Sequence, residues 1–99
     1  MVSTVDYNSP MLIHQEDYEH PTQASRVRLA VFEQKPGAEP PVNGLPWGPG
    51  FLVTEERQGA GKVVATLGLF PTREEAMRRL AARGRELELQ LYNRVPPAA

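Results

Sequence analysis

The chain has 99 residues, no cysteine and a formal net charge of −1, and 40% of its residues are hydrophobic. A chain of this length buries one small core, and the absence of cysteine excludes both a disulfide framework and thiolate metal sites. The first nine residues contain no Lys or Arg and no long apolar run, which predicts neither a signal peptide nor a membrane span. We therefore expect one small soluble domain, in a reducing cytoplasm and without membrane contact.

Charge divides the chain into two parts. Residues 1–25 contain four acidic and no basic residues, whereas the remainder holds all 11 basic residues against 8 acidic ones. Residues 1–25 also sustain no apolar period of a strand or helix. The pattern predicts an acidic, largely flexible leader, with residues 11–13 as a short packed segment at most, before a mildly basic folded part.

Three segments have the composition or the alternation of a strand with one buried face. Within residues 26–34, apolar side chains recur at every second position from Val27 to Val31. A second strand begins at Phe51, and a third covers residues 62–70. The short Gly-Ala-Gly sequence between the last two predicts a hairpin turn, because glycine tolerates positive φ angles.

Residues 35–49 form a loop by composition, since five prolines and four turn-forming Gly or Asn residues interrupt any strand ladder. Trp47 lies within this loop. An indole in such a position either folds back over a small core or binds a partner.

A helix is expected after Pro71, where Thr72 is suited to cap it and Glu75 follows three positions later, as in a capping box. Apolar or small residues then recur at intervals of three and four along one side. Gly84 lies in the middle of this seam, where a glycine lets a strand approach closely. The seam consists of Met77, Leu80, Gly84, Leu87 and Leu91.

An alternative remains for residues 85–92, because leucines at every second position there also fit a strand, and Gly84 would then end a shorter helix. Helix propensity favours one long helix that ends near Tyr92, since no β-branched residue occurs between Glu74 and Asn93.

These elements predict an α+β fold in which a small antiparallel β-sheet of three or four strands packs against one long C-terminal helix. The domain would span residues 26–94, between the leader at 1–25 and a tail at 95–99.

No arrangement of residues indicates an enzyme, a metal site or a cofactor site. The Gly-Lys pair at 61–62 is followed by Val63, whereas a phosphate-binding loop requires Ser or Thr there. His14 and His20 lie near acidic residues in the leader, where ligands without a rigid scaffold would hold a metal poorly.

Four cations of the folded part are candidate nucleic-acid contacts, namely Arg57, Lys62, Arg78 and Arg85, and would form a modest phosphate-facing patch. Glu55 and Glu56 precede the first of them. Because adjacent residues on a strand point to opposite faces, these two carboxylates are not expected to converge on one substrate atom.

Residues 57–62, the strand after them, the sequence Phe70-Pro71-Thr72-Arg73-Glu74-Glu75-Ala76 and the helix to Tyr92 together resemble the WGR domain. That family has a small sheet packed on a long helix and the motif Trp-Gly-Arg-x-Gly-x-x-Gly. Arg57 matches the motif Arg, and Gly59 and Gly61 match its glycines. Glu55 and Glu56 replace the motif Trp and Gly, and Leu91 replaces a glycine that often precedes the closing Tyr.

The resemblance implies a non-enzymatic binding module of a type also found in bacterial proteins, with DNA or RNA as its partner. The alternative hypothesis is a protein-interaction or regulatory module in which Trp47 and the proline-rich loop bind an unidentified protein.

Overall fold

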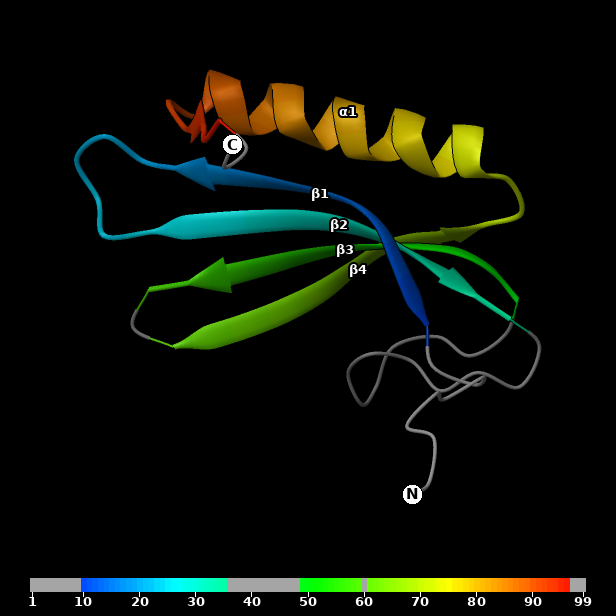
Figure 1. Ribbon diagram of the computed structural model, residues 1–99. Helices are drawn as coiled ribbons and strands as arrows, with labels where there is room; N and C mark the ends of the chain where they lie inside the picture. Colours follow the sequence, from blue (N-terminus) through cyan, green and yellow to red (C-terminus); the bar gives the residue numbers. More distant parts are fainter. Residues whose placement is uncertain (1–9, 36–48, 60, 97–99) are drawn as a thin grey trace.

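The computed structural model describes residues 10–35, 49–59 and 61–96. Within these residues, five antiparallel strands form one sheet, and a single helix covers one face of it (Figure 1). The predicted α+β fold is therefore confirmed. The strands lie in the order β4-β3-β2-β1-β5, and the elements are β1 (Met11–Glu19), β2 (Arg26–Gln34), β3 (Gly50–Gln58), β4 (Lys62–Phe70), α1 (Arg73–Leu89) and β5 (Asn93–Arg94).

Strand β1 corrects the prediction of a flexible leader for residues 11–19. It pairs with β2 along its whole length, and Tyr18 is only 2% exposed. The domain therefore begins before residue 26. The alternation was not visible in the sequence because the helix-facing positions His14 and Glu16 are polar, and they satisfy each other through a hydrogen bond.

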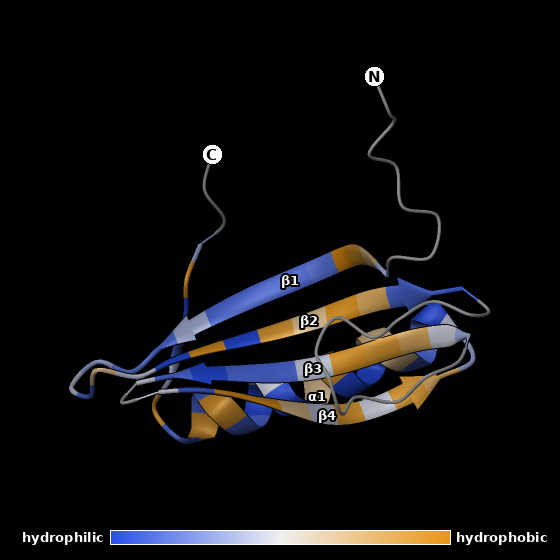
Figure 2. Cartoon of the chain, turned by 90° about the horizontal axis from the view of Figure 1, so that it is seen from below, coloured by the Kyte–Doolittle hydropathy of each residue, from blue (hydrophilic) through white to orange (hydrophobic). Residues whose placement is uncertain are grey.

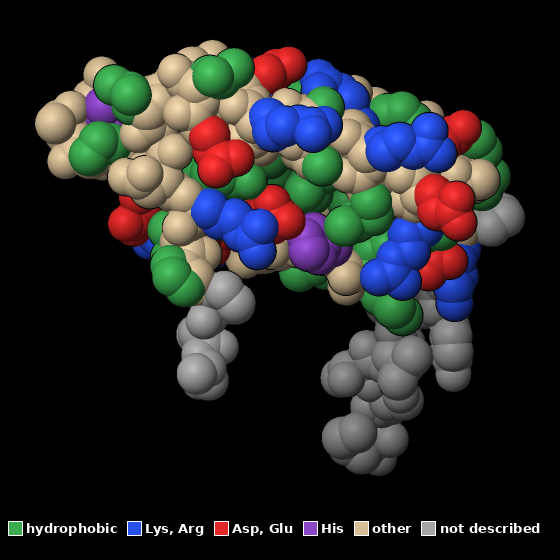
Figure 3. Space-filling view, turned by 90° about the horizontal axis from the view of Figure 1, so that it is seen from above, with side chains coloured by type: hydrophobic (Ala, Val, Ile, Leu, Met, Phe, Trp, Pro, Cys, Tyr) green, Lys and Arg blue, Asp and Glu red, His purple; other side chains and the backbone are tan. Residues whose placement is uncertain are grey.

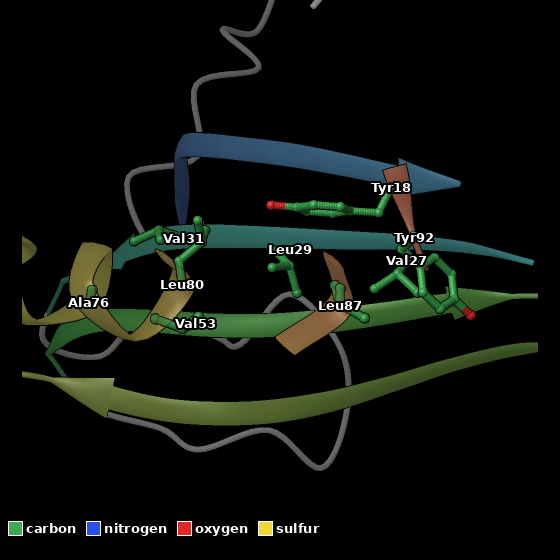
Figure 4. Close-up of a cluster of buried hydrophobic side chains, with 9 residues drawn as sticks. All are labelled: Tyr18, Val27, Leu29, Val31, Val53, Ala76, Leu80, Leu87 and Tyr92. Carbon is green, nitrogen blue, oxygen red and sulfur yellow. The ribbon is translucent and has the colours of Figure 1, made fainter. Parts of the chain in front are cut away.

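The sheet presents two different faces. Core side chains of the three inner strands point toward α1, among them Val27, Leu29 and Val53, and they pack against Leu80 and Leu87 of the helix (Figure 4). Since successive residues of a strand alternate, the positions between them point to the other side, here called the open face. Within the described residues no helix lies on the open face.

The helix begins as predicted. Thr72 is its N-cap, and the Thr72 hydroxyl accepts a hydrogen bond from the Glu75 amide at 3.2 Å. The single-helix interpretation is correct up to Leu89, which rules out a strand over residues 85–89. None of the helices in the described residues is long and apolar enough to cross a membrane.

The helix stops three residues earlier than predicted because its end is a Schellman motif. The amide of Tyr92 donates to the Leu87 carbonyl at 3.0 Å, and the amide of Leu91 donates to the Glu88 carbonyl at 3.1 Å. This geometry requires a left-handed residue, usually glycine, and Leu91 fills that position with a φ of 72°. The chain then turns back, so that Tyr92 is buried and β5 can pair with β1.

The predicted loop at 35–49 matches the interval between the end of β2 and the start of β3. Trp47 and the proline-rich sequence at 36–48 lie outside the described residues.

Gly84 has the role that the sequence predicts. It lies buried in the middle of α1, and a Cβ placed there would collide with the Tyr18 hydroxyl and lie 3.3 Å from Tyr18 Cζ. The missing side chain therefore lets β1 approach the helix.

We expect Gly84→Ala to destabilise the protein by about 1–3 kcal/mol, although alanine is the better helix former, because the new methyl group overpacks this contact. The cost should be smaller in a Tyr18→Phe background, which lacks the hydroxyl. Urea unfolding of the four proteins of this double-mutant cycle measures the difference. An equal cost in both backgrounds would contradict the assigned contact.

Leu91→Gly should stabilise the protein by about 1 kcal/mol, because glycine adopts the left-handed conformation without the steric cost that a Cβ adds. Little packing is lost, since Leu91 is 67% exposed. Leu89→Gly is the matched control: it removes a leucine that is 85% exposed from the last turn of the helix and should cost up to about 1 kcal/mol. Thermal unfolding of both variants tests this, and a destabilising Leu91→Gly would refute it.

Candidate functional site

Two of the four cations predicted to contact phosphate are already paired with acids. Arg57 lies on the helix-facing side of β3, and its Nε donates to Glu55 Oε2 at 2.7 Å. Lys62, at the start of β4, holds its Nζ 2.8 Å from Glu56 Oε1. Glu55 packs against the helix and Glu56 points to the open face, so these adjacent carboxylates point to opposite faces, as predicted.

The other two predicted cations lie on the helix. Arg78 and Arg85 are seven residues apart and exposed, on the side of α1 opposite its buried residues. Within the described chain neither forms an ion pair. Seen from this side, Lys and Arg side chains are interspersed with Asp and Glu (Figure 3). The structure thus brings Arg78 and Arg85 onto one face, and places Arg57 and Lys62 on two other surfaces.

A buried ion pair that the sequence did not predict joins the helix to the sheet. Glu55 is only 6% exposed, and it accepts hydrogen bonds from Arg83 of α1, at 2.5 Å from Nε and 3.2 Å from Nη2. Arg83 also donates to Glu86 at 2.8 Å. Because the Arg83 guanidinium makes two bonds to one carboxylate, it fixes how the helix is rotated over β3.

This ion pair controls the protonation of Glu55. Burial alone would raise the pKa of Glu55, but hydrogen bonds from Arg83 and then Arg57 outweigh burial and hold the pKa below its usual value. The hydrogen bond to Glu55 likewise raises the pKa of Arg83. Both groups are therefore charged at neutral pH, and their bonds join the helix to the sheet.

A second polar network lies along the helix-facing side of β1. Glu16 accepts a hydrogen bond from the Tyr18 hydroxyl at 2.9 Å, and its other oxygen lies 2.9 Å from His14 Nε2. Burial and then the bond to Glu16 raise the pKa of Tyr18 to about 12. Burial would raise the pKa of Glu16, but the bonds from His14 and Tyr18 lower it overall. The network thus supplies hydrogen-bond partners for the polar side chains that β1 places on the helix side of the sheet.

The two histidines that lie near acidic residues in the sequence have different roles in the structure. His14 pairs with Glu16, whereas His20 Nδ1 accepts from the amides of Thr22 and Gln23 and so organises the β1–β2 turn. No group of three His, Cys, Asp or Glu side chains gathers in the described part of the chain.

Charged side chains cover one end of the open face. They stand in two rows across the strands, and opposite charges are adjacent: Arg28 Nε lies 2.9 Å from Asp17 Oδ1, and Arg26 Nε lies 3.2 Å from Glu19 Oε1. Toward the other end the rows become apolar, as in the row formed by Leu12, Phe32 and Leu52 (Figure 2). Among the described residues, the charges of the open face thus neutralise one another and form no cationic track for a phosphate backbone.

The outer edge of β4 remains without a partner. Within residues 10–35, 49–59 and 61–96 no strand pairs with it. None of the nine residues of β4, all of which the structure describes, is buried, and Val63 is 63% exposed. An unpaired edge presents a row of backbone N–H and C=O groups that another chain can bind. No local pattern predicts this edge, because the order of the strands is set by the fold.

No family model, no curated protein and no solved structure matches this chain. The resemblance to the WGR domain therefore remains a prediction.

The ion pair of Glu55 predicts how stability depends on pH. Because the pKa of Glu55 lies below its usual 4.5 in the folded chain, its stabilising effect is present above that pH and is lost as the pH falls through the folded-state pKa. We expect the free energy of unfolding to fall less upon acidification in Glu55→Gln than in the wild type. Glu19→Gln, at a half-exposed surface pair, should keep the wild-type profile. Urea unfolding at a series of pH values measures this, and parallel profiles for Glu55→Gln and the wild type would contradict it.

Proposed function

We propose that this chain is a non-enzymatic protein-binding module of the reducing cytoplasm, which takes an extended strand of its partner onto the edge of β4. The observation that carries the proposal is the outer edge of β4, which pairs with no strand in the described part of the chain. The first five residues of β4 include one charged side chain, Lys62. Edge strands of natural proteins are usually blunted by charges, prolines or covering segments. An edge that keeps a long uncharged stretch is suited to strand addition.

Strand addition accounts for the chemistry present at this edge. Backbone hydrogen bonds supply affinity for any extended peptide, and the alternating side chains of β4 select among peptides. On the helix side the selecting residues are Val63 and Ala65, which lie opposite Arg57 and Glu55 of β3. A matching partner strand would therefore be uncharged and rich in small or β-branched residues.

A second candidate function is the nucleic-acid binding implied by the WGR resemblance. Arg78 and Arg85 support it, because they share the outer face of α1 and form no ion pair in the described structure. Two arginines make few phosphate contacts, so such binding would be weak and steeply dependent on salt.

One set of variants tests both candidates. Peptides selected from a random library displayed on phage are titrated against the wild type, the double variant Val63→Lys with Ala65→Lys, and Arg78→Ala with Arg85→Ala. Ala81→Lys, at an exposed helix position, is the control for added charge. We expect uncharged peptides to be selected, and their affinity to fall at least about tenfold only in the β4 variant.

The same proteins are titrated with duplex and single-stranded DNA and RNA at low and physiological salt.

Failure to select any peptide, or peptide binding that the β4 variant does not weaken, would overturn the strand-addition proposal. Nucleic-acid binding that persists at physiological salt and depends on Arg78 and Arg85 would establish the second candidate in its place.

A further inference from the structure

The free edge of β4 consists of two unequal halves. From Lys62 to Thr66 the strand pairs with β3 without interruption, whereas the register shifts at Leu67 and Gly68 follows with a φ of 154°. Such a bulge twists an edge away from further pairing. Within the regular half, four of the five residues are exposed. This half, residues 62–66, is the part of the edge that is shaped for a partner.

The opposite edge of the sheet carries protective features that residues 62–66 lack. Strand β5 pairs with Tyr18 and Glu19 of β1, and the Val95 amide then bonds to the Asp17 carbonyl at 2.8 Å. Farther along, a register shift between Leu12 and His14 interrupts β1. The two edges therefore differ in their capacity to accept another strand.

We propose that residues 62–66 pair with the same residues of a second copy of the chain, antiparallel about a two-fold axis at Val64. The inference rests on the proposed function and names its partner. In this register Val63 lies opposite Ala65 of the second copy, Lys62 lies opposite Thr66, and Val64 lies opposite itself. The result is a continuous sheet through both copies, with both helices on the same face, because the two-fold axis is perpendicular to the sheet.

The pattern of side chains is complementary to itself in this register. On the helix side, the exposed Val63 and Ala65 are covered by the same two residues of the second copy. On the open face, the two Lys62 side chains lie at opposite ends of the pairing, and each is already neutralised by Glu56 of its own chain at 2.8 Å. No like charges are placed directly opposite one another, which would be unfavourable.

The flanking residues of β3 add no opposing charge. Arg57 lies beside Val63 and Glu55 beside Ala65, and these two side chains are bonded to each other within each chain. Five paired residues bury less than the roughly 1,200 Å² of the smallest standard interfaces. The dimer is therefore reversible and depends on protein concentration.

Sedimentation equilibrium from low micromolar to millimolar concentration tests the pairing. The wild type should pass from monomer to dimer over this range. Val63→Lys with Ala65→Lys places like charges opposite one another twice and should weaken dimerisation at least about tenfold. Val63→Lys with Ala65→Glu places opposite charges at the same two positions and should restore the dimer relative to the Lys pair. Ala81→Lys should dimerise as the wild type does.

A cross-link provides a second measurement that does not depend on these charges. The chain has no cysteine, so Val64→Cys introduces a single thiol at the two-fold axis. Two opposed strand positions are close enough for a disulfide. We expect a disulfide-linked dimer under mild oxidation, and little of it from Ala81→Cys at the same concentration.

A wild type that remains monomeric at millimolar concentration would overturn the inference. So would a dimer that Val63→Lys with Ala65→Lys and Val63→Lys with Ala65→Glu weaken equally. Equal cross-linking of Val64→Cys and Ala81→Cys would also overturn it. A monomeric chain that still binds selected peptides at β4 would overturn the second copy as partner while the proposed function stands. A dimer formed at β4 without peptide binding would restrict the function to self-association.

Discussion

A single helix cannot cover a sheet of four long strands, and this constraint shapes the rest of the molecule. A helix with its side chains is about 10 Å wide, and neighbouring strands lie about 4.8 Å apart, so α1 leaves part of the sheet uncovered. It packs against β2, β3 and β4, and it meets β1 mainly at Tyr18. Strand β1 accordingly buries Tyr18 alone, whereas β2 and β3 have buried residues on both faces of the sheet. In β4, Leu67 and Phe70 are partly buried against the core. Strand β1 must therefore be stabilised largely by other means.

Two specific contacts position the helix over the sheet, in addition to the apolar core. Toward β1, the missing side chain of Gly84 admits the Tyr18 ring, whose hydroxyl is held by Glu16. Toward β3, Arg83 reaches the buried carboxylate of Glu55. These contacts and the chain reversal after Leu91 stabilise the β1 side of the sheet. Strand β4 packs on the core through Leu67 and Phe70, but within the described residues no strand pairs with its outer edge.

Local patterns predicted much of this fold. Alternation identified β2, the Gly-Ala-Gly turn identified the β3–β4 hairpin, and Thr72 identified the helix start. Strand β1 was missed because His14 and Glu16 occupy its helix-facing positions, where an apolar pattern was expected. The helix end was misplaced because Leu91 adopts a conformation that favours glycine, which a sequence pattern does not reveal.

The candidate site was less predictable, because it depends on which strands are neighbours. Local alternation correctly assigned Glu55 and Glu56 to opposite faces. The pairing of Glu55 with Arg83, 28 residues away, follows only from the packing of α1 on β3. The four predicted cations are all basic, but the fold places them on three different surfaces. The exposure of β4 follows from the order of the strands in the sheet, which no local sequence pattern predicts.

The claim that the first half of β4 is an interaction edge is tested most directly by amide hydrogen exchange measured over a range of protein concentrations. The account predicts that exchange of the outward-pointing amides within residues 62–66 slows as the protein concentration rises, while exchange of the unpaired amides of β1 does not change. Exchange at residues 62–66 that is independent of protein concentration, or that slows equally along both edges of the sheet, would contradict the account.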